Sequence, residues 1–201
     1  MEPRRKYKDS IVEPLNEVVK KALVEMLFSF STIAADATNP IKEIAKKFMK
    51  EMMWRWTADC LVDGKIWVDR IKTVTKYVPS TQAAIRKMAV SVEPTKEVTH
   101  EHVVPSGFLV AHIIGSKLNR LQIMDLMQNY CKAVIVTKDE DGLLRAAGLN
   151  SVMPKGWKFG DDCYERYKQT WTKNRSSTLY DCIIFPDLIQ STFLPRVPQQ
   201  N

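Results

Sequence analysis

Residues 97–105 read EVTHEHVVP, and residues 133–137 read AVIVT. The first stretch has the pattern of a β-strand and ends at Pro105, whereas the second is a short apolar run typical of a strand buried on both faces. Thr137-Lys138-Asp139-Glu140 fits the S/T-x-x-E capping box, and the helix that it begins should stop at Gly148. This part of the chain therefore predicts two strands followed directly by a helix.

The first strand carries two of the three histidines of the chain, on either side of a glutamate. Side chains alternate along a strand, so Glu101 and His102 should point to opposite faces, and His100 should share the face of His102. Such neighbours can divide the work of a site, one holding a metal ion while the other faces a substrate. A bend at Pro105 would let both side chains line the same cleft.

Residues 101–105, EHVVP, resemble the first motif of the His-Me finger (HNH) nucleases. The stretches VTKDEDGLLR, MPKGW and YERY further along also look like the downstream part of HNH-like proteins of bacteria and phages. The resemblance spans roughly residues 97–170. It implies a ββα-metal module, here with a helical insertion of about thirty residues between its two strands.

The resemblance also implies roles for single residues. His102 would be the general base that activates water against a phosphodiester, and Glu101 would be a metal ligand. Asp141, near the start of the helix, is the best candidate for a second ligand. Carboxylate ligands favour Mg²⁺ or Mn²⁺, whereas Zn²⁺ or Ni²⁺ would be favoured if His100 or His112 also coordinates.

Each of these residues also has a purely structural interpretation. His102 can be a hydrogen-bonded strand residue, and Asp141 can favour the N-terminus of its helix through the helix dipole. Glu140 is better explained as the capping-box partner of Thr137, and His112 as a histidine at the boundary of the core. The asparagine that orients the base in HNH nucleases has two candidates here, Asn119 and Asn129.

Residues 1–92 are expected to form a helical region built on a hairpin. Apolar residues recur at helical spacing in two segments on either side of Asn39-Pro40, which marks a helix start. The expected core faces are Leu15, Val18, Val19, Ala22, Leu23, Met26, Leu27 and Phe30 in the first helix, and Ile41, Ile44, Ala45, Phe48, Met49, Met52 and Trp56 in the second. Residues 65–78 are predicted to form a strand pair or an extended arm.

The stretch 155–175 interleaves basic and aromatic residues, which suits contact with phosphates and stacking on bases. The candidate nucleic-acid-binding residues are Lys155, Lys158, Arg166, Lys168, Lys173 and Arg175. The alternative is a solvated segment whose aromatic residues belong to the core. Residues 176–201 are expected to form an extended C-terminal tail, so that the nuclease-like module would occupy residues 93–175.

The pattern along the chain predicts a mostly helical α+β protein, with an N-terminal helical hairpin and a ββα-metal-like module. The 201 residues carry a formal net charge of +7 at pH 7, which permits binding of nucleic acid. No apolar run is long enough to cross a membrane, and the four widely spaced cysteines suit a cytoplasmic protein with reduced thiols.

The sequence thus predicts a metal-dependent endonuclease acting on nucleic acid, with DNA as the expected form. The alternative is a non-enzymatic protein-interaction or DNA-binding factor, such as a phage would encode, with a nuclease-like fold. The N-terminal helices are candidates for binding a partner protein or a second copy of the chain.

Overall fold

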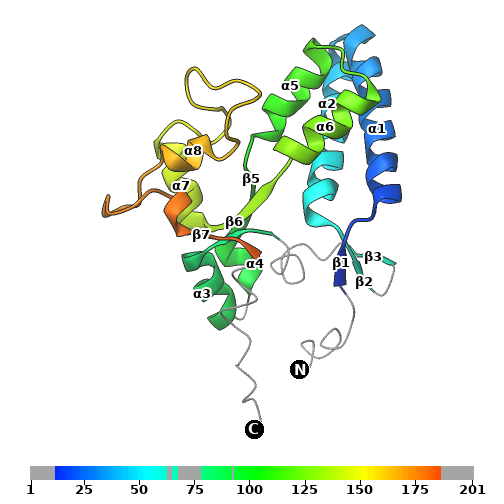
Figure 1. Ribbon diagram of the computed structural model, residues 1–201. Coiled ribbons are helices and arrows are strands. Elements are labelled where there is room, and N and C mark those ends of the chain that lie inside the picture. Colours follow the sequence, from blue (N-terminus) through cyan, green and yellow to red (C-terminus); the bar gives the residue numbers. More distant parts are fainter. Residues whose placement is uncertain (1–11, 63–64, 68–77, 92, 187–201) are drawn as a thin grey trace.

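The computed structural model describes residues 12–62, 65–67, 78–91 and 93–186. The N-terminal part is a helical hairpin of α1 (Glu17–Asp36) and α2 (Asn39–Ala58). Beneath it lies a small antiparallel sheet, in the order β1-β2-β3, made of β1 (Val12–Pro14), β2 (Cys60–Val62) and β3 (Lys65–Trp67). Figure 1 shows the two helices side by side at one edge of the molecule.

Local signals explain the ends of both hairpin helices. The Asn16 side chain accepts a hydrogen bond from the backbone N–H of Val19 at 3.0 Å and so caps α1. Pro40 lies in the first turn of α2, where its missing N–H costs nothing, and Thr38 takes the cap position. Leu27 and Met53 are fully buried in the main core.

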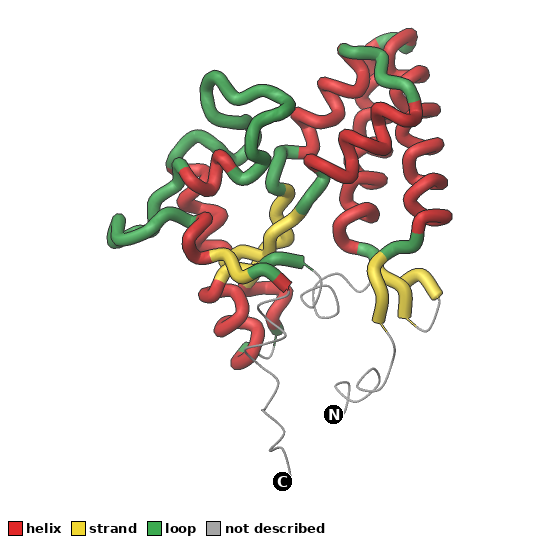
Figure 2. Tube along the Cα trace, in the orientation of Figure 1, coloured by secondary structure: helices red, strands yellow, loops and turns green. Residues whose placement is uncertain are grey.

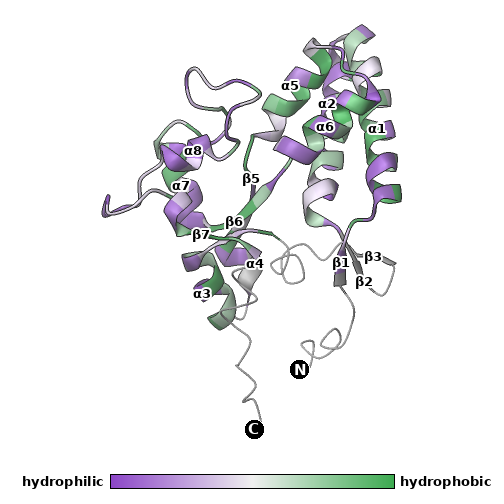
Figure 3. Ribbon diagram, viewed as in Figure 1, coloured by the Kyte–Doolittle hydropathy of each residue, from purple (hydrophilic) through white to green (hydrophobic). Residues whose placement is uncertain are grey.

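Two further helices pack across this hairpin, α5 (Ser106–Gly115) and α6 (Arg120–Tyr130). They lie between residues 102 and 133, where a helical insertion of about thirty residues was expected. Their packing against α1 and α2 is visible in Figure 1, and colouring by hydropathy shows hydrophobic segments in α5 and a mainly hydrophilic α7 (Figure 3). The insertion therefore joins the N-terminal hairpin to the rest of the molecule.

The second sheet has the order β5-β6-β4-β7. Its strands are β4 (Ser80–Thr81), β5 (Val98–His102), β6 (Ala133–Thr137) and β7 (Ile183–Ile184). β5 and β6 pair antiparallel, with His102 opposite Ala133, and β4 runs parallel to β6. Figure 2 shows these strands between the N-terminal helices and the C-terminal loops.

The helix α7 (Lys138–Ala146) begins directly after β6, and Thr137 and Glu140 form the predicted capping box. The expected order of strand, strand and helix is thus present. The remaining helical elements are α3 (Gln82–Val90), α4 (Pro94–Glu97), α8 (Glu165–Lys168) and the 3₁₀ turn η2 (Tyr180–Cys182). The chain is accordingly a mostly helical α+β protein with an N-terminal helical pair.

Four expectations differ from the structure. In α1 the residues Val18, Ala22 and Met26 are exposed rather than buried, because the face toward the core carries Leu23, Val24 and Leu27. In α2 the residues Ile41, Ile44 and Phe48 are about half exposed rather than buried, because the face toward the core is centred on Ala45 and Met49. Residues 176–186 are not a simple extended tail, since they form η2 and then pair through β7 with β4. Both β4 and β7 lie outside the expected 93–175 module but belong to its sheet.

Two other expectations fall partly on residues outside the described ranges. Of the predicted arm at residues 65–78, residues 68–77 lie outside the described residues, as do residues 187–201 of the expected tail. Among the helices that the structure describes, none combines the length and apolar character needed to cross a membrane.

Candidate functional site at the end of strand β5

The two histidines of β5 lie on the face of the strand that meets α2. Their rings are 5.7 Å apart, and the ring of Trp54 is 4.4 Å from that of His100 and 6.1 Å from that of His102. Both Nε2 atoms approach Thr57 at 3.4 Å, His100 at the carbonyl oxygen and His102 at Oγ1. The shared face predicted for His100 and His102 is confirmed.

Glu101 has a different partner, the guanidinium of Arg166 in α8. The Arg166 side chain is fully buried, and it also donates hydrogen bonds to the backbone carbonyls of His102, Val103 and Leu149. The pair fixes the Glu101 carboxylate while about a fifth of its side chain stays exposed. Strand alternation thus separates Glu101 from the two imidazoles, as the sequence predicts.

Two further groups lie within electrostatic range of Glu101. Burial raises the pKa of Glu101, Arg166 lowers it, and the charge of Asp141 in the first turn of α7 raises it again. The Tyr167 hydroxyl is buried and has no hydrogen-bond partner among the described residues. Burial raises its pKa, the charge of Arg166 opposes this shift, and the charges of Glu101 and Asp141 add to it. Two carboxylates and an unsatisfied hydroxyl therefore share one region.

Glu101 and Asp141 are carboxylates, the ligand type that hard divalent cations prefer. Mg²⁺ is commonly held by one or two carboxylates, with water and phosphate oxygens completing its shell. Glu101 and Asp141 are both about a fifth exposed, and a metal-bound water would give the Tyr167 hydroxyl a partner. Within the described parts of the chain, no three or more His, Cys, Asp or Glu side chains form a metal-binding group, so protein ligands alone would not fill the shell.

Burial favours the neutral form of both imidazoles. Burial, helped by the charge of His102, lowers the pKa of His100 to about 4. Burial also lowers the pKa of His102, although a hydrogen bond with the Met53 backbone opposes the shift. A neutral imidazole can accept a proton, so His102 has the protonation state that a general base requires.

The other acidic and histidine candidates have structural roles. Glu140 is buried and accepts hydrogen bonds from the Thr137 backbone N–H at 2.8 Å, the Thr137 hydroxyl at 2.9 Å and the Thr81 hydroxyl at 2.7 Å. It is the capping residue expected from the sequence. His112 stacks on Phe159 at 4.0 Å between ring centroids and is partly exposed on α5, as expected of a boundary histidine.

Neither candidate for the orienting asparagine contacts His102. Asn119 caps α6 together with Gln122, and Asn129 bonds to Asp125. Thr57 is instead the side chain that meets His102 Nε2 among the described residues.

The predicted basic interface is partly exposed. Arg166 does not face solvent, because its guanidinium is enclosed by carbonyl oxygens and Glu101, so its expected contact with nucleic acid was wrong. Lys168 is exposed, pairs with Asp162 at 2.5 Å and lies 5.1 Å from the Tyr180 ring. The other candidates, all exposed, are Lys155, Lys158, Lys173 and Arg175.

The aromatic residues of this stretch divide between core and surface. Tyr164 and Tyr167 are buried, and Trp157 packs at 5.6 Å from the Phe108 ring, as the core interpretation expects. Trp171 is 54% exposed and remains available for stacking.

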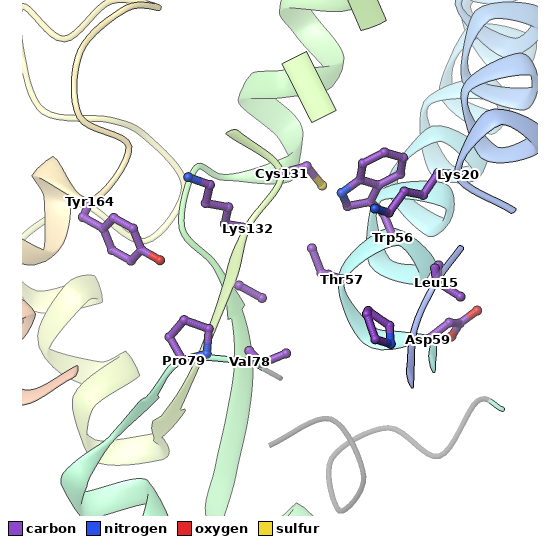
Figure 4. Close-up of a pocket in the computed structure, with 12 residues that line it drawn as sticks. Leu15, Lys20, Trp56, Thr57, Asp59, Val78, Pro79, Cys131, Lys132 and Tyr164 are labelled. Atoms are coloured by element: carbon purple, nitrogen blue, oxygen red, sulfur yellow. The ribbon is translucent and has the colours of Figure 1, made fainter. Parts of the chain in front are cut away.

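A cavity of about 230 Å³ adjoins the histidine face. Figure 4 shows Trp56 and Lys20 on one side of it and Tyr164 and Lys132 on the other. Thr57 lines the cavity and also contacts His102, so this residue links the cavity to the candidate base.

Sequence reasoning missed the residues that hold this site. Thr57 lies 45 positions before His102, and Arg166 lies 65 positions after Glu101, so no local spacing relates them. The signals in the sequence were a threonine near the end of α2 and the arginine within the YERY stretch. No family model, no curated protein and no solved structure matches this chain.

Proposed function

We propose that this chain is a metal-dependent endonuclease of the His-Me finger type that hydrolyses phosphodiester bonds in nucleic acid, with DNA as the expected substrate. One observation carries the proposal. The end of β5, in a strand-strand-helix arrangement, presents His102 on one face and Glu101 on the other, and Glu101 lies within electrostatic range of Asp141 on the following helix.

Glu101 and Asp141 would hold the divalent cation, Mg²⁺ or Mn²⁺. When bound, the cation supplies charge stabilisation to the phosphate and to the leaving oxygen. Arg166 acts as a positioning residue, because its guanidinium fixes one oxygen of Glu101 and leaves the exposed part of that carboxylate for the ion.

His102 supplies the proton acceptor. Thr57 and Trp54 restrict its ring, and burial keeps it neutral, so it can take a proton from an attacking water at neutral pH. The Tyr167 hydroxyl, which has no hydrogen-bond partner in the described part of the chain, can hydrogen-bond to water near the carboxylates.

Basic side chains offer the contacts that a polyanion needs. Lys20 and Lys132 line the cavity next to Thr57, and the exposed lysines of residues 155–173 extend the positive surface. The free thiols of Cys131, Cys163 and Cys182 are in keeping with a cytoplasmic location.

The buried Arg166–Glu101 pair favours a second candidate. Arg166 already neutralises Glu101 without a metal ion, and such a pair can serve structure alone. In that case the chain would be a non-enzymatic DNA-binding or protein-interaction factor with a nuclease-like fold.

Plasmid nicking distinguishes the two candidates. The wild-type protein should nick DNA with Mg²⁺ or Mn²⁺, and His102→Ala should lower the rate by about 10² to 10⁴, the usual contribution of a general base. His112→Ala is the matched control and should cut at the wild-type rate, because this histidine packs on Phe159.

Cleavage that survives His102→Ala would refute the nuclease proposal as stated. If the wild type fails to cut with Mg²⁺, Mn²⁺, Zn²⁺ or Ni²⁺ but shifts DNA in a gel with a steep salt dependence, the DNA-binding alternative is supported.

A further inference from the structure

Six large apolar side chains form a strip on the outer side of the N-terminal hairpin. Five of them are exposed: Met26 by 47%, Ile33 by 46%, Ile41 by 51%, Ile44 by 54% and Phe48 by 48%. The sixth, Phe30, is half-buried. We call this set the apolar strip.

Helical spacing places these residues on one continuous face. Met26, Phe30 and Ile33 follow one another at intervals of four and three in α1, as Ile41, Ile44 and Phe48 do at three and four in α2. The rings of Phe30 and Phe48 stack at 5.0 Å with an angle of 6° between their planes, which joins the two rows.

The core-facing sides of the hairpin are already occupied. Leu27 of α1 and Met49 of α2 are fully buried in the main core, which also includes residues of α5 and α6. The apolar strip therefore has no covering element among the described residues, although its side chains match the core in chemical character.

We propose that a second copy of this chain covers the apolar strip and that the two hairpins form a symmetric four-helix bundle. Five half-exposed side chains present on the order of 450 Å² of apolar surface, if each has a full surface of about 180 Å², within the range for a large side chain. Two copies would bury about 900 Å² of apolar surface, and with the polar rim the total would reach the roughly 1,200 Å² of a small specific interface.

A two-fold axis can place the apolar strip of one copy against the same strip of the second copy. An axis perpendicular to the helices at the level of Phe30 and Ile44 sets each helix antiparallel to its copy. Ile41 would then meet Phe48 of the second copy, and Met26 would meet Ile33 of the second copy. The axis also brings Glu43 and Lys47, which are centred on residue 45, opposite each other at the rim.

The inference is independent of the proposed nuclease activity, and oligomeric state tests it. Light scattering after gel filtration and sedimentation equilibrium, from about 1 to about 100 µM protein, should show a wild-type dimer. Ile44→Glu should give a monomer over this range, because it would bury a charge against its own copy. Leu121→Glu is the matched control, since Leu121 is 83% exposed on α6 outside the strip, and it should remain a dimer.

Two more variants sharpen the test. If circular dichroism shows that Ile44→Glu does not fold, Ile41→Glu, nearer the hairpin turn, replaces it with the same expected monomer. Lys47→Glu should weaken the dimer several-fold, and Glu43→Lys together with Lys47→Glu should restore it. A wild type that is monomeric throughout, or a dimer that persists in the folded glutamate variant, would overturn the proposal.

Discussion

Replacing Arg166 with methionine should destabilise the fold by about 4 kcal/mol, the central value for removing one partner of a buried ion pair. The Arg166 side chain is fully buried. It donates to the carbonyls of Val103 at 2.8 Å and Leu149 at 2.8 Å, as well as to that of His102 and to the Glu101 carboxylate. Methionine keeps much of the volume but leaves these oxygens without their donor.

Counting the lost interactions gives a similar loss of folding free energy. Each lost hydrogen bond contributes about 1 kcal/mol net, and the neutral acceptors number four, the carbonyls of His102, Val103, Leu149 and Asn150, of which Asn150 is a long contact at 3.3 Å; this gives about 3 to 4 kcal/mol before the charge of Glu101 is considered. Glu101 is only partly buried, so water screens some of its uncompensated charge and adds about 1 kcal/mol rather than the full penalty.

Urea denaturation at pH 7 measures the loss. Arg145→Met is the matched control, because Arg145 is 72% exposed and its pair with Asp141 is a surface pair at 3.4 Å, so it should change stability by less than about 0.5 kcal/mol. Adding Glu101→Gln to Arg166→Met should recover about 1 kcal/mol, since the unpaired charge is then removed. Equal losses in the Arg166 and Arg145 variants would refute the reasoning.

Three further predictions concern other buried groups. Burial lowers the pKa of His100 to about 4, so the stability that depends on its neutral form is complete above pH 6.5 and falls by about 3 kcal/mol as the pH drops to 4. In urea titrations, the free energy of unfolding of His100→Phe should vary with pH by that much less than in the wild type. The same pH dependence in both proteins would contradict the prediction. Glu140→Ala should cost about 3 kcal/mol in the same assay, because three donors lose their buried acceptor, whereas a loss below about 0.5 kcal/mol would show that water replaces the carboxylate. Burial raises the pKa of the Cys131 and Cys163 thiols, so mass spectrometry after treatment with a thiol reagent at pH 8 should find both unmodified in the native protein and modified in urea; rapid native labelling would argue against their burial.

Local patterns were sufficient for the elements that build the site. The capping box at Thr137 and the apolar run before it predicted β6 and α7, and both lie as expected. These signals are local because a cap bonds only three residues away. The alternation of β5 likewise predicted that His100 and His102 share a face, which their common contact with Thr57 confirms.

The remaining features of the fold and site depend on tertiary contacts, which local sequence patterns do not reveal. The partner of Glu101 comes from a short helix late in the chain, and periodicity gives no information on which arginine is drawn into the core. Periodicity also could not fix which of two adjacent apolar faces of α2 turns inward. Ala45 and Met49 are buried, whereas Ile44 and Phe48 are about half exposed.

The strand order β5-β6-β4-β7 has a consequence for biosynthesis. The sheet brings together segments near residues 80, 100, 135 and 184, so its last edge comes from almost the end of the described chain. Closing such long loops is slow compared with forming the helical hairpin, whose contacts are local. On the ribosome, α1 and α2 can therefore pair early. The edge of β4 that pairs with β7 stays open until residues 183–184 have been synthesised and have emerged. Proteases should cut nascent chains stalled before that point more readily than longer ones.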